Sequence, residues 1–390
     1  MSRATAAANR PRPPLRIALD ATPLLGARTG VGRYVEQLVH ALREALPAGD
    51  VPDVRLVPLT WRGARDLADA APSLPGVTAG GRRVPARVLR ELWARGGFPP
   101  AEWLSGPADI WHGTNFVLPP TRRASGVFTV HDLTYLRHPT WVTPDVARYA
   151  TLVPKALRRA AAICTPSHAV RAELLDAYGD VEAARVVVTP LCVDPALFKT
   201  TPPDAAARRR LGLPARYLLF LGSAEPRKGL DTLLDAYRLL HGRGADLPPL
   251  LIVGPPGWGD ATDRRGLPPE LVVTAGYRPS VEIPAIVAGA SALVYPSRYE
   301  GFGLPPLEAF ATGVPAVVSD LVVTREVLGD LADYAAVDDA ESLADAIGLA
   351  LERGPAEGGA ARRAHARGFT PTALATTTLD AYRVALALSS

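Results

Sequence analysis

The feature that most constrains the fold is a repeated alternation of short apolar runs with longer segments of helical periodicity. It begins at Leu15 and continues almost to the end of the chain. This is the pattern of parallel α/β sheets, in which each strand is followed by a helix that returns to the next strand. A stretch rich in Pro, Thr and Asp, 190–214, interrupts the alternation. The pattern therefore predicts two doubly wound domains that face each other across a cleft.

The apolar runs give the expected strands of each domain. In the first domain they are 15–20, 54–59, 110–112, 126–130, 162–165 and 186–189, and in the second 217–221, 250–253, 272–275, 292–295 and 315–319. Ser167 is the expected N-cap of a helix that runs toward Tyr178. Thr370 followed by Pro371 predicts the start of a last helix that extends to about Leu388.

Composition bounds the class of protein. At 390 residues, 48% hydrophobic and 21% charged, the chain is globular and long enough for two domains. A net charge of +4 suits an anionic ligand or an anionic membrane surface, and does not require nucleic acid. Because neither a membrane span nor a signal peptide is visible in the sequence, we expect a cytoplasmic protein. Residues 1–14 show no periodicity and are expected to form a disordered leader.

The string from Tyr295 to Pro315 carries two glutamates, Glu300 and Glu308, around a Gly-Phe-Gly loop and a double proline. Prolines are tolerated in the first turn of a helix, so the string predicts a strand, a loop and a helix start. The backbone N–H groups of Gly301, Phe302, Gly303 and Leu304 then form a site for a diphosphate and for sugar hydroxyls. Because carboxylates do not meet phosphate, the two glutamates are expected to accept hydrogen bonds from hydroxyl groups.

A second string, Gly222-Ser-Ala-Glu-Pro-Arg-Lys-Gly, directly follows the expected strand that ends at Leu221. Arg227 can fork across two phosphate oxygens, while Lys228 acts as a point charge, so this loop suits a leaving diphosphate. The strand that ends at Val253 is also followed by glycine, in Gly254-Pro-Pro-Gly-Trp-Gly. That segment is either a loop beneath the nucleotide or a plain turn.

Together these strings resemble the motifs of family-4 retaining glycosyltransferases of the GT-B fold, which include an E-x7-E string and an E-P-R-K-G phosphate motif. The resemblance covers nearly the whole chain. It implies an acceptor-side domain at 15–195, a nucleotide-sugar domain at 205–370 and a terminal helix, 371–388, that packs back on the first domain. It also implies that His131 lies against the donor sugar.

In the first domain, Gly30-Val-Gly32-Arg-Tyr leads into an amphipathic helix and resembles the family's loop over the donor diphosphate and acceptor. A dinucleotide-binding oxidoreductase fits this Gly-x-Gly badly. The loop before it is too long, and the next strand ends without an acidic residue for a ribose. His112 ends one expected strand and the pair His131-Asp132 follows another, at the ligand-facing edge of the sheet. His112 either joins this site or holds the adjoining loop in place.

The resemblance, taken with these residues, implies a retaining enzyme that moves a hexose from a nucleoside diphosphate sugar to an acceptor hydroxyl. Arg227 and Lys228 stabilise the leaving diphosphate, Glu308 holds the ribose, and Glu300 faces the sugar. The resemblance favours mannose, and the acceptor is a glycan, a lipid-linked sugar or a small molecule. No metal or other cofactor is expected. A non-catalytic sugar-nucleotide-binding protein and a nucleotide-sugar epimerase of the same fold are the alternatives.

Residues 85–95 predict a basic amphipathic helix on the acceptor-side domain. Such a helix either touches anionic lipid at the inner face of the membrane or is an ordinary solvated helix with its apolar side in the core.

Overall fold

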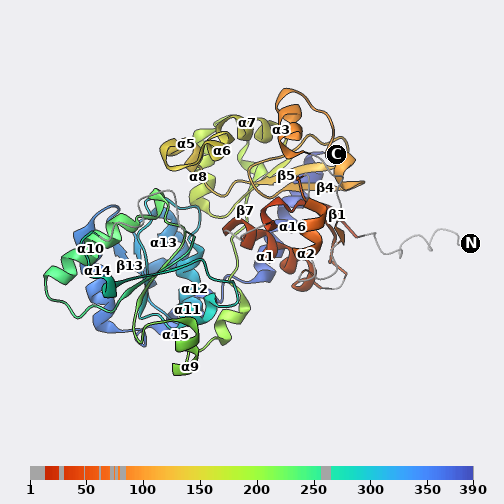
Figure 1. Ribbon diagram of the computed structural model, residues 1–390. Helices are drawn as coiled ribbons and strands as arrows, with labels where there is room; N and C mark the ends of the chain where they lie inside the picture. The colour runs from red at the N-terminus through yellow and green to blue at the C-terminus, as the bar shows by residue number, and fades with distance from the viewer. Residues whose placement is uncertain are drawn as a thin grey trace, which may run out of the picture.

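The computed structural model describes residues 14–25, 30–47, 49–60, 63–70, 74, 78–79, 85–255 and 265–389. Within these residues the chain forms two α/β domains, each built on a parallel sheet (Figure 1). The first sheet has seven strands in the order β3-β2-β1-β4-β5-β6-β7. The second has six, in the order β10-β9-β8-β11-β12-β13. The doubly wound fold class predicted from the sequence is confirmed.

The strands follow the expected apolar runs closely. In the first domain they are β1 (Arg16–Asp20), β2 (Asp53–Val57), β3 (Thr78–Ala79), β4 (Ile110–Gly113), β5 (Ser125–Thr129), β6 (Ala162–Thr165) and β7 (Val186–Val188). In the second domain they are β8 (Leu218–Leu221), β9 (Leu250–Val253), β10 (Val272–Gly276), β11 (Ala292–Tyr295), β12 (Ala316–Ser319) and β13 (Asp333–Ala335).

The helices cover the sheets. In the first domain they are α1 (Gly30–Glu44), α2 (Gly63–Ala70), α3 (Ala86–Arg95), α4 (Glu102–Ser105), α5 (Thr134–Arg137), α6 (Pro144–Ala147), α7 (Tyr149–Arg159) and α8 (His168–Ala177). Those that follow are α9 (Ala205–Leu211), α10 (Leu230–Gly242), α11 (Ile283–Ala288), α12 (Leu304–Thr312), α13 (Val322–Leu328), α14 (Ala340–Arg353), α15 (Gly359–Ala366) and α16 (Pro371–Leu388).

The central strands are covered on both faces, which explains why they read as continuous apolar runs and not as alternating ones. Every residue of β4, β5, β6, β8, β9, β11 and β12 is buried. The expected caps are also confirmed. The Ser167 side chain accepts a hydrogen bond from the Val170 amide at the start of α8, and the Thr370 side chain accepts one from Ala373 at the start of α16.

Two strands and one helix differ from the expectation. β3 and β13 are edge strands of two and three residues, too short to give a periodic signal. The stretch 190–214 is not wholly irregular, because α9 forms within it. Asp204 caps that helix by accepting a hydrogen bond from the Ala207 amide at 2.8 Å. Apart from Pro14, the expected leader lies outside the described residues.

The last helix, α16, returns to the first domain. Figure 1 shows it in blue beside α1, far from the other elements of similar colour. Its buried residues, Leu374, Ala375, Ala381, Tyr382 and Ala385, join the core formed by α1 and the first sheet. The chain therefore crosses between the domains twice.

Strand order reverses once in each sheet, between β1 and β4 in the first and between β8 and β11 in the second. In open α/β sheets, ligands bind outside the carboxyl ends of the strands at such a switch point. The Arg227-Lys228 loop follows β8, and the Glu300 loop follows β11. The two strings singled out in the sequence therefore meet where this topology places a ligand site.

Candidate active site

The loop between β11 and α12 has the form that the sequence predicts. The α-helix α12 begins at Leu304, and both Pro305 and Pro306 lie in its first turn. Gly303 precedes the helix with φ 90°, a left-handed conformation that favours glycine. Phe302 and Leu304 are buried in the domain core. The apolar side chains of this loop therefore anchor it, while its glycines shape the backbone at the helix N-terminus.

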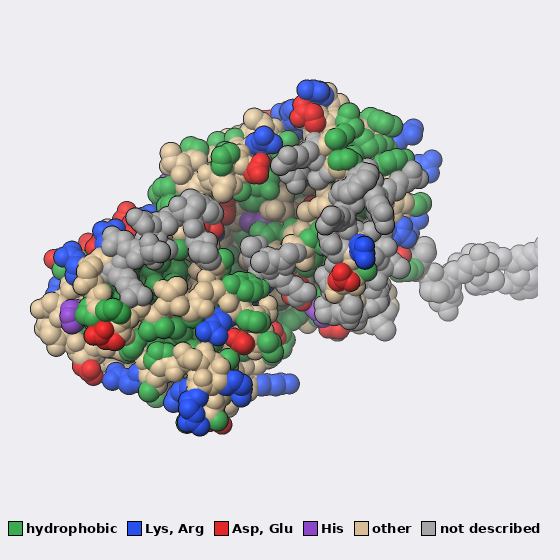
Figure 2. Space-filling view, in the orientation of Figure 1, with side chains coloured by type: hydrophobic (Ala, Val, Ile, Leu, Met, Phe, Trp, Pro, Cys, Tyr) green, Lys and Arg blue, Asp and Glu red, His purple; other side chains and the backbone are tan. Residues whose placement is uncertain are grey.

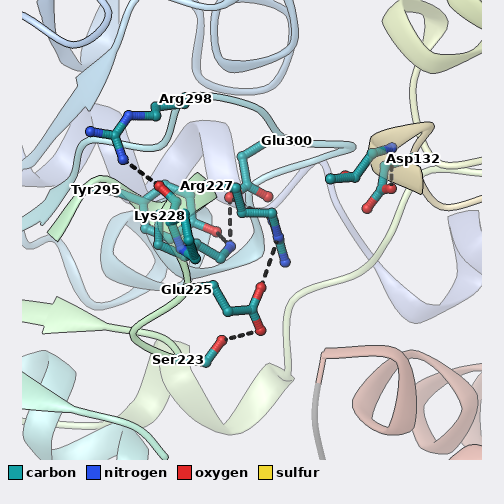
Figure 3. A network of polar contacts seen from close by, with 10 residues as sticks. Asp132, Ser223, Glu225, Arg227, Lys228, Tyr295, Arg298 and Glu300 are labelled. Atoms are coloured by element: carbon teal, nitrogen blue, oxygen red, sulfur yellow. Dashed lines mark hydrogen bonds and ion pairs between the residues drawn. The ribbon is translucent and has the colours of Figure 1, made fainter. Parts of the chain in front are cut away.

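Arg227 and Lys228 lie in a short 3-10 turn, Pro226–Lys228, after β8, and both point to Glu300 (Figure 3). Lys228 Nζ lies 2.5 Å from Glu300 Oε1 and 2.5 Å from the Tyr295 hydroxyl. Arg227 donates from Nη1 to the same Glu300 oxygen at 3.3 Å and from Nε to Glu225 at 3.0 Å. The two predicted strings thus form one network of alternating charge.

The charges of this network determine the ionisation of Glu300. Burial alone would raise its pKa, but the charges of Lys228 and Arg227 outweigh burial and lower the pKa to about 2. For Lys228, burial and the neighbouring Arg227 lower the pKa, and the Glu300 charge opposes them. Glu300 is therefore a carboxylate at neutral pH, tied to two cations.

Two of the predicted glycines bring the loops after β8 and β9 together. A Cβ on Gly254 would collide with the carbonyl of Gly222, so only glycine fits there. Gly222 in turn donates its amide to the Val253 carbonyl at 2.9 Å. Residues 256–264, which include the glycine-rich segment after Pro255, lie outside the described residues.

His131 and Asp132 come from the first domain, directly after β5. His131 Nε2 donates to the Thr114 carbonyl at 2.8 Å, which leaves the proton on Nε2 and the lone pair of the neutral ring on Nδ1. Burial lowers the pKa of His131. The Asp132 carboxylate accepts the Thr134 amide at 2.9 Å. In Figure 3, Asp132 lies apart from the cation network. Burial alone would lower the pKa of Arg227, but the charge of Glu300 and, after it, that of Asp132 raise the pKa.

His112 is placed differently from the other predicted site residues. It is completely buried, and its Nδ1 and Nε2 lie 2.8 Å from the Tyr382 hydroxyl and the Thr129 hydroxyl respectively. Both ring nitrogens are thus engaged within the protein. The inclusion of His112 in the loop around the diphosphate has no support in this geometry. His112 does not hold the adjoining loop through its ring either, because its two ring partners fasten α16 to the first sheet.

Gly30 and Gly32 form the first turn of α1, and residues 26–29 of the preceding loop lie outside the described residues. The next residue, Arg33, reaches into the second domain. Its Nη1 donates to Glu308 Oε2 at 3.3 Å, and its Nη2 donates to Glu308 Oε1. The Glu308 side chain is completely buried, whereas that of Arg33 is 28% exposed. Glu308 therefore meets a guanidinium from the other domain.

Further hydrogen bonds join the two domains. Ser167 donates to the Gly301 carbonyl at 2.8 Å, and the Tyr299 hydroxyl donates to Glu173 at 2.6 Å. Tyr299 also accepts the Leu133 amide, which adjoins His131-Asp132, at 2.9 Å. Figure 2 shows the surface hollowed between the two domains. The cation network, the α12 loop and the His131 segment thus belong to one site formed by both domains.

Several residues of the site were not recognised from the sequence. Arg33 and Glu225 stood inside the quoted strings, but their partners were not foreseen because both roles depend on packing between distant segments. Tyr295 looked like the end of a buried strand, yet its hydroxyl reaches Lys228. A tyrosine or charged residue at the carboxyl end of a strand next to the switch point would have been the usable signal.

None of the helices in the part of the chain that the structure describes is long and apolar enough to cross a bilayer. Among the same residues, no group of three or more His, Cys, Asp or Glu side chains is arranged to hold a metal ion.

Comparison with known proteins identifies the family. Residues 28–197 match the family described as Glycosyltransferase Family 4, and residues 215–353 match Glycosyl transferases group 1. The O-antigen chain mannosyltransferase B of Escherichia coli is 30% identical, over 95% of this chain and 100% of the relative. The O-antigen chain mannosyltransferase RfbU of Salmonella typhimurium is 26% identical, over 82% of this chain and 86% of the relative.

Solved structures agree on the fold. HepE of Anabaena, determined in complex with UDP-glucose, superimposes with a TM-score of 0.68 at 17% identity, covering 93% of this chain and 98% of HepE. The chain therefore belongs to the group 1, family 4 glycosyltransferases and has the GT-B fold. It is an enzyme that transfers a glycosyl group.

Proposed function

We propose that this glycosyltransferase transfers a hexose from a nucleoside diphosphate sugar to an acceptor hydroxyl with retention of configuration. The observation that carries the proposal is the pair Arg227 and Lys228, placed after β8 at the switch point and next to the N-terminus of α12. The buried Lys228 and the partly buried Arg227, beside a set of backbone N–H groups, suit a diphosphate leaving group. HepE, whose solved complex contains UDP-glucose, supports the class of donor.

In this proposal the donor spans the edge of the second sheet. The diphosphate contacts Arg227 and Lys228. Its oxygens then replace part of the pairing of these two cations with Glu300. Charge that develops on the leaving group is then stabilised by groups already in position, usually the largest contribution to catalysis. Glu308 receives the ribose hydroxyls, and Glu300 and His131 border the sugar. Because the proton of the neutral His131 ring lies on Nε2, its Nδ1 atom can accept a hydrogen bond from a hydroxyl group.

Retention is proposed to follow a front-face course. Glu300, the carboxylate expected beside the sugar, is paired with two cations, and its pKa is lowered to about 2, so it is a weak nucleophile. The departing phosphate would then take the proton of the acceptor hydroxyl on the face that it leaves. The other carboxylates of the site are engaged as well, because Glu308 pairs with Arg33, Glu225 pairs with Arg227, and Asp132 accepts the Thr134 amide. We therefore assign none of them as the nucleophile of a double displacement.

Two further parts of the proposal concern the sugar and the acceptor. Mannose is supported by the two relatives named as O-antigen chain mannosyltransferases. A glycan, a lipid-linked sugar or a small molecule would supply the hydroxyl. We propose that no metal is needed, because Arg227 and Lys228 supply the positive charge that a divalent ion would otherwise bring. Assays repeated in EDTA test this point.

A thermal-shift screen with a panel of nucleotide sugars tests the donor class. A ligand that binds only the folded state raises the unfolding temperature in proportion to the logarithm of its concentration over its Kd. The proposal predicts a rise with one nucleotide diphosphate sugar and a smaller rise with the matching nucleoside diphosphate. A flat response to the whole panel would contradict it. The two alternative functions, donor binding without turnover and epimerisation, are separated by the product that forms.

Peripheral membrane contact at the inner face is a further proposal, carried by the surface around α3. Val88 and Leu92 on this helix are 52% and 44% exposed, and Phe98 just beyond it is 74% exposed. Figure 2 shows hydrophobic side chains gathered at this end of the first domain, with Lys and Arg side chains nearby. Sedimentation with anionic vesicles should carry the protein down, and Phe98→Asp should reduce the bound fraction. Equal sedimentation of both proteins would count against this contact.

A further inference from the structure

Glu308 is the residue that the proposed function assigns to the ribose, yet in this structure both of its oxygens accept hydrogen bonds from Arg33 of the other domain. The Glu308 side chain has no exposed surface, so no open position beside it could receive a hydroxyl. A nucleotide that reaches Glu308 must therefore displace a group that is already there.

Arg33 presents its hydrogen-bond donors to Glu308 in the same way as a ribose would. A guanidinium presents two parallel N–H donors to the two oxygens of a carboxylate. A ribose presents two vicinal hydroxyls, which also donate to two oxygens of one carboxylate. Arg33 thus offers Glu308 the same number of donors as the 2′- and 3′-hydroxyls.

The surroundings of Arg33 allow it to leave Glu308 without losing all neutralising charge. Asp194, in the segment that connects the domains, and Glu36, one turn further along α1, both attract the Arg33 guanidinium. The Arg33 side chain is also 28% exposed, so part of it already contacts solvent. The guanidinium therefore keeps favourable negative charge nearby when it leaves Glu308.

From these observations we infer that Arg33 is a specificity-determining residue of the donor site. It stands in for the ribose on Glu308, and it is exchanged for the two ribose hydroxyls when a nucleoside diphosphate binds. Because Arg33 lies on α1 and Glu308 on α12, this exchange links donor binding to the contact between the domains. The inference rests on the proposed function, in which Glu308 is the ribose partner.

The exchange has a measurable consequence for affinity. When only a fraction of the molecules has the binding-competent site, the apparent affinity is the intrinsic affinity multiplied by that fraction. Removing the competitor should therefore tighten binding of a ribonucleotide. The gain should be absent for a nucleotide without ribose hydroxyls, because such a ligand has no need to displace Arg33.

The test is calorimetry at pH 8 with UDP, GDP and a 2′,3′-dideoxynucleoside diphosphate. We expect Arg33→Gln to bind the preferred ribonucleotide about fivefold or more tightly than the unmodified protein, with little change for the dideoxy analogue. In a Glu308→Gln background the same Arg33→Gln change should have little effect, because the two residues act through each other. Arg43→Gln, on the same helix but bonded to the Pro52 carbonyl, is the matched control and should leave affinity unchanged.

Arg33→Gln leaves a buried carboxylate without its cation and can fail to fold for that reason. Arg33→Lys keeps the charge but cannot make two parallel bonds, so it should give a smaller gain of about twofold. An unchanged Kd in both variants, or weaker binding that persists in the Glu308→Gln background, would overturn the inference, the latter by showing that Arg33 contacts the ligand directly. If the unmodified protein binds no nucleoside diphosphate, the proposed function falls, and this inference falls with it.

Discussion

Gly301 of the second domain lies directly against the backbone carbonyl of His131 in the first domain, and the structure leaves no room between them for a Cβ. The loop that carries Glu300 therefore touches the segment that carries the proposed sugar-contacting histidine. A hydrogen bond from Ser167 to the Gly301 carbonyl, 2.8 Å long, holds the same point. A Cβ at position 301 would collide with a backbone atom of His131, and a rotamer change cannot move a backbone atom out of the way.

A Gly301→Ala variant tests this contact. The added methyl should push the Glu300 loop away from His131, and misplaced reacting groups lower turnover strongly, here by about tenfold or more. Initial rates with the preferred donor would measure the loss, and thermal unfolding would check the fold. Gly348→Ala in α14, where nothing lies within 4 Å of the added carbon, serves as control. Rates equal to those of the control would mean that the contact does not position the site.

Lys228→Ala removes the lysine that pairs with Glu300 and Tyr295. Turnover should fall by about 10²-fold or more, as expected when a preorganised charge beside the leaving group is lost. The fold should remain, because Arg227 still pairs with Glu300. Arg227→Ala should lower turnover similarly. The exposed Lys199→Ala provides a matched loss of charge, and near-normal rates in the two site variants would remove the diphosphate assignment.

The two glutamates should separate in their effects. Glu308→Gln should weaken binding of the free nucleoside diphosphate, because a carboxamide accepts hydroxyl hydrogen bonds at one atom and not two. Glu300→Gln removes a negative charge next to Arg227 and Lys228, so affinity for the free nucleotide should stay the same or rise while turnover of the full donor falls. Calorimetry beside initial rates measures both. The opposite pattern would mean that the two roles are reversed.

His112 should make stability depend on pH. Burial first, and the neighbouring His131 second, lower its pKa from 6.5 to about 3. The unfolded chain therefore takes up a proton below pH 6.5 that the folded chain refuses, so this contribution to stability is complete above pH 6.5 and is lost as the pH falls toward 3. Between pH 7 and pH 5 the unfolding free energy should fall by about 1 to 2 kcal/mol more than in His112→Gln. Urea denaturation at both pH values measures it, and parallel losses would show that His112 is not buried and neutral.

The sequence predicted the central strands, the α12 loop and the cation string, because each depends on local composition and on glycine or proline at particular positions. It could not predict β13, which has three residues and is partly polar. His112 looked like His131, a polar residue near the end of a strand, and only the return of Tyr382 on α16 shows where it belongs. The Arg33–Glu308 pair joins residues 275 positions apart, so no local pattern could show it.

The central claim, that the enzyme breaks the bond between a sugar and a nucleoside diphosphate and keeps the sugar's configuration, is tested most directly by following the donor itself. The protein is incubated in EDTA with GDP-mannose, UDP-glucose and other nucleotide sugars, and the sugar is observed by NMR from the first turnovers. We predict that one donor releases its nucleoside diphosphate, with the sugar transferred to an acceptor or to water in the anomeric configuration of the donor. Donors that all remain intact, a sugar of inverted configuration, or an isomerised sugar still attached to its nucleotide would contradict the account.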